Sequence, residues 1–167
     1  MSEEKLTNAF QFERAMSRDA CYMNDKLIQQ HSFLNKIYPY ALNTINLVTY
    51  CEDHTVSLLS ASLEIGRIHK NTEFANRISE ISCGLDHEGN LKSYAYDLTT
   101  LHKIYKHPQT RFVFEGSKIP HFNQLKSFAI QLHSENKTNG VISWKMALDS
   151  EGQAILLTTL MENDNLL

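Results

Sequence analysis

The chain uses one short phrase twice, as LDHEGN at 85–90 and as LDSEGQ at 148–153. In each copy Asp holds the first position and Gly the fourth position of a four-residue turn. That arrangement suits a type I turn followed by a glycine in the left-handed region. Both phrases are flanked by strand-forming residues, so they predict β-hairpins over 78–97 and 141–161.

The sequence around the two phrases also runs in parallel. Each hairpin follows a segment with helical spacing, and each of these segments follows a short β-rich run, INLVTY at 45–50 and RFVFEG at 111–116. The parallel suggests a duplicated strand–helix–strand–strand unit over 44–97 and 110–161. The competing interpretation is that hairpins of this type are common and that two of them prove nothing.

The segment at 44–51 is ambiguous on its own. Its β-branched and aromatic residues favour a strand, although the spacing of Leu42, Ile45 and Thr49 also allows a helix. The parallel with the second unit decides for a strand. We then expect a helix over 52–70, with an apolar stripe at Val56, Leu59 and Leu63.

The N-terminal region predicts a long amphipathic helix. It ends by Pro39, because the residue before a proline avoids the helical region. Apolar residues recur there at helical spacing, namely Phe12, Met16, Ala20, Met23, Leu27 and Leu34. This helical arm would occupy residues 1–40.

The expected fold class is therefore α+β, with an N-terminal amphipathic helix followed by a mixed or antiparallel sheet with helices. The α+β domain would span 41–161, with a linking helix at 98–107 and a further helix at 117–135, and 162–167 would form a disordered tail. The element order resembles a strand–helix–strand–strand module whose paired copies form ligand-binding clefts in some regulatory domains.

Charge and composition exclude some classes of function. The net charge of −3 over 167 residues and the scattered Lys and Arg give no long-range field for nucleic acid or anionic membrane. The three cysteines, Cys21, Cys51 and Cys83, are odd in number and indicate a reducing compartment. The N-terminus is acidic and polar, without a signal peptide, so we expect a cytoplasmic protein; signal-independent export remains an alternative.

Patterns with specific chemistry are absent from the sequence. Eight histidines occur without a His-x-x-x-His or Cys-x-x-Cys spacing, so neither a metal nor another cofactor is expected. CEDH at 51–54 places a thiol beside an imidazole, but a base normally approaches a nucleophile from elsewhere in the fold. A helix-capping turn is the better interpretation of that segment. No Gly-rich phosphate loop or nucleophile elbow is present.

Five residues are the candidate binding residues. Tyr94 and Tyr96 share one face of the strand that returns from the first hairpin, and aromatic residues on half-open sheets are enriched in interfaces. Trp144 is a third candidate, with the hydrophobic core as its competing assignment. Met23 and Leu27 complete the set as apolar positions of the N-terminal helix.

These observations lead to two hypotheses. The first is a non-catalytic, soluble protein-binding module, an adaptor, chaperone-like or regulatory protein, that binds a protein partner or self-associates through its N-terminal helix, without nucleic acid or membrane. Small acidic secretion chaperones are similar in combining helices and hairpins. The alternative is a small-molecule-binding or enzymatic α+β domain with a pocket between sheet and helices. Its expected polar liners are His54, Glu64, His102, Tyr94 and Tyr96.

Overall fold

The computed structural model describes residues 22–23, 26–67 and 81–161, and their side chains from residue 28 onward. The elements follow the chain as β1 (Tyr22–Met23), β2 (Lys26–Leu27), α2 (Ser32–Ile37), β3 (Thr44–Glu52), β4 (Thr55–Ile65), β5 (Ile81–Leu85), β6 (Leu91–Asp97), β7 (Lys103–Ile104), α3 (Phe122–Asn136), β8 (Gly140–Leu148) and β9 (Ala154–Met161).

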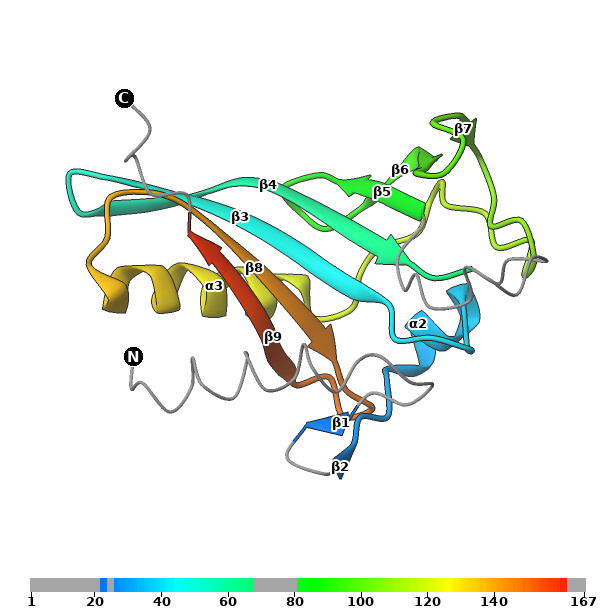
Figure 1. Ribbon diagram of the computed structural model, residues 1–167, viewed down its shortest axis with the longest axis horizontal. Coiled ribbons are helices and arrows are strands. Elements are labelled where there is room, and N and C mark those ends of the chain that lie inside the picture. The colour runs from blue at the N-terminus through cyan, green and yellow to red at the C-terminus, as the bar shows by residue number, and fades with distance from the viewer. Residues whose placement is uncertain (1–21, 24–25, 68–80, 162–167) are drawn as a thin grey trace.

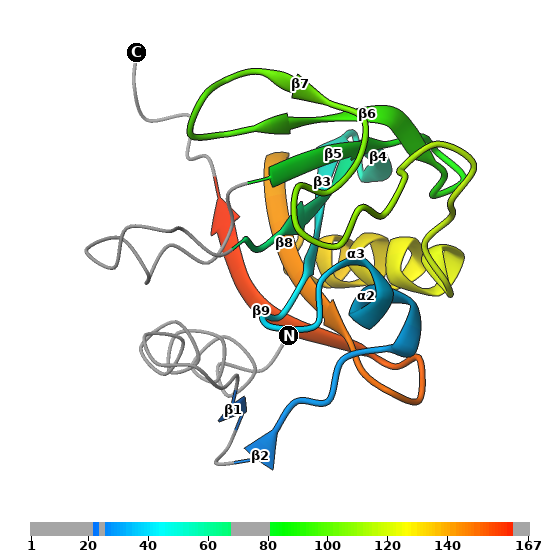
Figure 2. The same cartoon turned by 90° about the vertical axis from the view of Figure 1, so that its right-hand side faces the viewer.

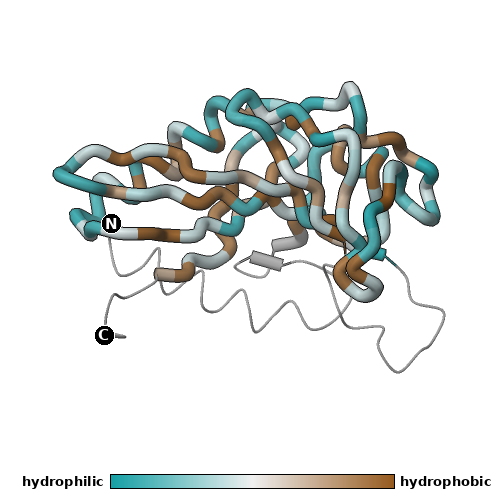
Figure 3. The backbone as a smooth tube through the Cα atoms, turned by 90° about the horizontal axis from the view of Figure 1, so that it is seen from above, coloured by the Kyte–Doolittle hydropathy of each residue, from teal (hydrophilic) through white to brown (hydrophobic). Residues whose placement is uncertain are grey.

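Seven strands form one antiparallel sheet in the order β7-β6-β5-β4-β3-β8-β9 (Figure 1). The short strands β1 and β2 pair only with each other. Apolar and polar residues alternate along the long strands, as the hydropathy colouring of Figure 3 shows. This alternation is typical of a sheet with one face packed on a core. Within the described residues, no helix is long and apolar enough to cross a bilayer.

Both helices pack on the same face of the sheet, where the main hydrophobic core lies (Figure 2). The 15-residue helix α3 contacts β3, β4, β8 and β9. Trp144 is the largest fully buried side chain of this core. The other fully buried large side chains are Tyr38, Phe114, Phe122, Leu34, Ile37, Ile45, Leu47, Leu63, Ile65, Ile81 and Ile119. The face under α3 is therefore filled by side chains.

The two turns expected from the repeated phrase are confirmed. Asp86 Oδ1 and Asp149 Oδ1 each accept backbone N–H groups from the residues two and four positions ahead, at 2.8–3.0 Å. Gly89 and Gly152 close the turns with φ values of 87° and 82°. The two turns therefore have equivalent hydrogen-bond patterns, and each joins the pair of strands that the sequence predicted.

The helix expected over 52–70 is wrong, because β4 runs through most of it and pairs with β3 from end to end. A β-bulge explains the error. Val48 pairs with Ser60 but Thr49 pairs with Leu58, so one residue of β4 is skipped and the inward face shifts by one position. Strand β3 itself is confirmed.

Other expected elements also differ from the structure. The linking helix at 98–107 is wrong, since that segment contains a turn and the two-residue strand β7. The strand at 110–116 is wrong as well, since only an isolated bridge from Lys106 to Val113 forms there. The helix expected at 117–135 is confirmed as α3.

The expected fold class is corrected by these findings. The described domain is a mainly antiparallel sheet with two helices, and it is not the α+β arrangement with a helix in each repeated unit. Among residues 44–67 and 81–97, the described part of the first unit, no helix precedes the hairpin. Most of the N-terminal helix lies outside the described residues, as does the expected tail. Within its described part, the helix is replaced by strands β1 and β2 and the six-residue helix α2.

Candidate functional site

The face of the sheet opposite α3, called the open face below, is the candidate site. Within the described residues, neither helix covers it, because both α2 and α3 belong to the other side (Figure 2). A small apolar cluster with Leu42, Ala147 and Leu157 closes this face at the β8–β9 end. The remainder of the open face carries mostly polar side chains.

Five half-buried polar side chains meet at the centre of the open face: Asn46, Ser62, Glu64, Ser143 and Lys145. We call them the polar cluster. They come together because Asn46 on the middle strand β3 pairs with Ser62 on one side and with Lys145 on the other. Side chains opposite each other on one sheet face lie close enough to interact.

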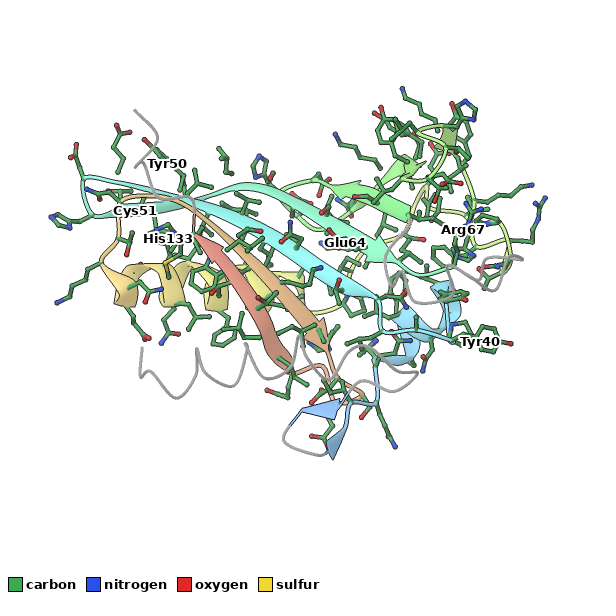
Figure 4. The ribbon with its side chains drawn as sticks, in the orientation of Figure 1. Tyr40, Tyr50, Cys51, Glu64, Arg67 and His133 are labelled. Atoms are coloured by element: carbon green, nitrogen blue, oxygen red, sulfur yellow. The ribbon has the colours of Figure 1, made fainter. Side chains whose placement is uncertain are left out.

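Two side-chain contacts organise the polar cluster. Lys145 Nζ lies 3.3 Å from Glu64 Oε2, so the lysine reaches across β3 to the strand beyond it. These two side chains retain 34% and 20% of their exposure, which leaves both charged groups accessible to a ligand. The Ser143 hydroxyl donates to Asn46 Oδ1 at 2.7 Å. The cluster thus offers an ammonium, a carboxylate, hydroxyl groups and an amide on one surface. Figure 4 shows Glu64 in the middle of the sheet.

A second group of side chains lies on the same face toward the β7 edge, and we call it the tyrosine–lysine cluster: Lys92, Tyr94, Tyr96 and Lys103. The two tyrosine rings meet edge to face with centroids 5.6 Å apart. Lys103 Nζ sits 4.4 Å from the centroid of the Tyr94 ring and 5.9 Å from that of Tyr96. A cation in this position is attracted by the ring quadrupole.

The strand register joins the two clusters. Tyr96 pairs with Ser82, and Ser82 pairs with Glu64. Lys103 pairs with Tyr96 from the other side. With strands spaced about 4.8 Å apart, Lys103 and Glu64 are separated by about 14 Å across the sheet. One continuous polar and aromatic strip therefore crosses the open face.

The residues proposed from sequence lie in different places. Tyr94 and Tyr96 belong to the tyrosine–lysine cluster. Trp144 lies in the core under α3 and is fully buried. Met23 and Leu27 fall in β1 and β2, and their side chains lie outside the described part of the structure. Of the expected pocket liners, Glu64 belongs to the polar cluster, while His54 sits at the exposed β3–β4 turn and His102 at the exposed turn before β7.

Sequence reasoning missed Asn46, Ser143 and Lys145. None of them belongs to a motif, and only the pairing of β3 with β4 and β8 brings them together. The assignment of β4 as a helix hid this arrangement, because it removed Ser62 and Glu64 from the sheet. The alternating polar positions of 140–148 were the one available signal.

A buried group under α3 resembles a catalytic pair but is structural. Trp144 Nε1–H donates to Thr49 Oγ1 at 2.8 Å, and that oxygen lies 2.7 Å from His133 Nδ1. His133 Nε2 lies 3.0 Å from the Thr138 carbonyl, which can only accept, so the proton is on Nε2 and Thr49 donates to Nδ1. All three side chains are fully buried, so no substrate reaches them. The network fixes α3 to β3 and β8.

Two further buried titratable groups, His107 and Cys83, have a structural role. Burial lowers the pKa of His107, whose Nε2 donates to the Gly66 carbonyl at 2.9 Å and whose Nδ1 accepts two backbone N–H groups. Burial raises the pKa of the Cys83 thiol to about 11, so this cysteine is protonated at neutral pH. A thiol in that state is a poor nucleophile.

The CEDH segment forms the β3–β4 hairpin turn, with Asp53 and His54 at positive φ, and it does not begin a helix. Cys51 is buried, and its Sγ lies 3.8 Å from Asn139 Oδ1, whereas His54 is exposed at the tip. Across the described ranges, no three His, Cys, Asp or Glu side chains gather in a way that could hold a metal ion.

Comparison with known proteins gives one result that bears on function. The model of the family described as sugar-transfer associated ATP-grasp matches residues 12–165. No curated protein and no solved structure matches the chain. The match points to an enzyme-type domain, so the expectation of a non-catalytic adaptor is wrong and the alternative of a small-molecule-binding or enzymatic domain fits better. Since the match covers nearly the whole sequence, the chain belongs to the sugar-transfer associated ATP-grasp family.

Proposed function

We propose that this chain is an ATP-binding domain of an enzyme whose ATP-dependent step is connected with sugar transfer, and that the nucleotide binds on the open face. The observation that carries the proposal is the family match over residues 12–165, whose description contains both terms.

The polar cluster has the groups that a nucleotide requires. Lys145 supplies an ammonium with three donors, and charge-assisted hydrogen bonds from such a group to phosphate oxygens are strong. Asn46 and Ser143 offer an amide and a hydroxyl beside it, which suit ribose hydroxyl groups or further phosphate oxygens. The side chains are half-buried on a rigid sheet, so little conformational entropy is lost when a ligand orders them.

ATP is usually handled as a magnesium complex, which raises the question of whether these residues fit the metal. Mg²⁺ is commonly held by one or two carboxylates together with phosphate oxygens, and it keeps several waters. Glu64 supplies one accessible carboxylate in the polar cluster. A metal carried by the phosphates and touched by Glu64 therefore fits, whereas a cage of three or more protein ligands does not fit the described residues. When bound, the metal would neutralise phosphate charge.

The ion pair between Lys145 and Glu64 gives the site a defined resting state. The two charges compensate each other, so neither is left alone on a partly buried surface. An incoming phosphate would compete for the ammonium and release the carboxylate toward a cation. The Lys145 ammonium would then face the negative phosphates, and the Glu64 carboxylate would face the bound cation.

The cellular setting follows from the same proposal. We propose that the domain works in the cytoplasm, where ATP is available. Cys51 and Cys83 are both free thiols, which fits a reducing compartment.

Titration calorimetry with ATP and magnesium, using the full chain, tests the proposal. Lys145→Met keeps the side-chain stem and removes the charge, and it should weaken ATP binding by about 10- to 100-fold, the value of a charge-assisted hydrogen bond. Lys36→Met is the matched control, because Lys36 is exposed at the end of α2 on the covered side of the sheet. Equal losses in the two variants, or no ATP binding by the unaltered chain, would overturn the proposal.

A further inference from the structure

We propose that the tyrosine–lysine cluster is a second subsite of the open face, which binds a sugar ring carrying an anionic group. This inference rests on the proposed function, because it places the sugar-linked substrate beside the nucleotide on one strip of the sheet. Four side chains at the β7 edge form this subsite: Lys92, Tyr94, Tyr96 and Lys103.

The positive charge of the tyrosine–lysine cluster favours an anionic ligand. Within the described residues, neither Lys92 nor Lys103 has a carboxylate within ion-pair distance, in contrast to Lys145 with its Glu64. Asp97, the acidic residue next to Tyr96, is buried and pairs with Arg67. The cluster is therefore locally cationic in a chain whose net charge is −3.

The position of Lys103 leaves its donors available. Its ammonium rests over the Tyr94 ring at 4.4 Å, and this contact uses no hydrogen-bond acceptor. The aromatic ring holds the cation in place. No described residue accepts a hydrogen bond from its three N–H groups, so they can donate to an anion. A lysine held on an aromatic face differs in this respect from a lysine in a salt bridge, whose donors are already engaged.

The shape of the cluster suits a ring. Tyr96 is 42% exposed and stands beside Lys103 on the open face. The stem of Lys92 crosses β5 where Gly84 has no side chain, with its Cδ 3.2 Å from the place a Cβ would occupy. Lys92 thus lies across β5, two residues from Tyr94 along the same strand. An exposed aromatic face flanked by ammonium groups can accept the C–H face of a pyranose while the cations hold its anionic substituent.

The strand register places this subsite close enough to the polar cluster for two ligands to bind side by side. Lys103, Tyr96, Ser82 and Glu64 stand in one row across four strands, about 14 Å from end to end. A nucleotide at the polar cluster and a sugar at the tyrosine–lysine cluster would therefore occupy neighbouring parts of the same surface. Ser82 lies between them as a small hydroxyl that blocks neither ligand.

The test uses amide chemical shifts of the isotope-labelled full chain with four probes: glucose 6-phosphate, glucuronate, glucose and inorganic phosphate. We expect saturable shifts at Tyr96 and Lys103 with both anionic sugars and much weaker shifts with glucose or phosphate alone. The two anionic sugars distinguish a phosphorylated sugar from a uronic acid. Equal shifts with inorganic phosphate would reduce the cluster to a general anion site and overturn the proposal.

Variants separate the aromatic and ionic contributions. Tyr96→Ala should weaken binding of the preferred anionic sugar about fivefold or more, and Lys103→Met about tenfold. Tyr40→Ala is the matched control, because Tyr40 is 75% exposed, follows α2 and is not part of the cluster (Figure 4). Unchanged affinity in both cluster variants would contradict the subsite.

The failure of this inference can be told apart from failure of the proposed function. If ATP binds in a Lys145-dependent manner but no sugar shifts Tyr96, the function stands and the subsite is wrong. If ATP itself shifts Tyr96 and Lys103 and displaces the sugar, the cluster holds part of the nucleotide and the inference is overturned. If neither ligand binds, both proposals fail.

Discussion

Gly89 and Gly152 occupy the same position in two matching hairpin turns, and both contact the start of helix α3. A Cβ on Gly89 would overlap the ring of Phe122, and a Cβ on Gly152 would overlap the ring of His121. The repeated phrase in the sequence therefore has an architectural role, since two turns from distant hairpins close on consecutive residues of one helix start.

Alanine substitutions at these glycines should be graded by what each Cβ meets. Gly116→Ala is the control, because Gly116 also has positive φ but nothing within 4 Å of its Cβ position, and it should cost about 1 kcal/mol from backbone strain. Gly89→Ala should cost a further ~1–3 kcal/mol, because Phe122 is buried and must move. Urea unfolding measures this order. A Gly89→Ala variant as stable as Gly116→Ala would refute the packing described here.

Thr49 should prove essential to the buried network under α3. Thr49→Val keeps the shape but leaves the Trp144 Nε1–H and the His133 Nδ1 without their shared partner, so we expect a loss of about 2–4 kcal/mol. Thr49→Ser retains the hydroxyl and should lose about 1 kcal/mol for one methyl group. Thermal and urea unfolding compare the two variants, and a serine variant no more stable than the valine one would contradict the hydrogen-bond assignment.

The Cys83 thiol should make stability depend on alkaline pH. Burial raises its pKa to about 11 in the folded chain from an ordinary value of 9.0, so above pH 9 the unfolded state loses a proton that the folded state retains. Stability is then complete below pH 9 and falls as pH rises toward 11, by up to about 2–3 kcal/mol. The difference in unfolding free energy between the original chain and Cys83→Ala should shrink over this range. A constant difference would refute the effect.

His107 should make the folded chain less stable at acidic pH, whereas Cys83 acts at alkaline pH. Burial lowers its pKa, so below its ordinary value of 6.5 the unfolded chain gains a proton before the folded chain does. Stability from this residue is therefore complete above pH 6.5 and is lost as pH falls below it. His107→Gln keeps a donor for Gly66 but does not titrate. Its unfolding free energy should fall less steeply between pH 7.5 and pH 5 than that of the original chain; parallel curves would argue against this assignment.

Local turn chemistry made both hairpins and their connections predictable from sequence. An Asp that accepts backbone N–H groups and a Gly at positive φ act within a few residues. The interactions that form each turn are therefore encoded in the short phrase itself. Helix α3 was also predictable, because Phe122, Leu125 and Leu132 follow helical spacing toward one face.

Strand β4 was not predictable from its apolar spacing, for a physical reason. Its bulge shifts the inward face by one residue at Leu59, so Leu58 and Ala61 point the same way three residues apart. The expected helical stripe of Val56, Leu59 and Leu63 therefore does not share one face, because Leu59 falls at the bulge and is 57% exposed. The polar cluster depends on this strand and on pairings between distant segments, so the alternating polar positions of 140–148 were its one local signal, and they could not show which side chains lie together.

The most direct test of the central claim is the footprint of ATP on the amide signals of the full chain, with magnesium present. Binding on the open face predicts saturable shifts around Asn46 and Glu64 on β3 and β4 and around Lys145 on β8, with α3 little changed. Shifts centred on α3, or none at all at saturating ATP, would contradict the placement of the nucleotide on this face of the sheet.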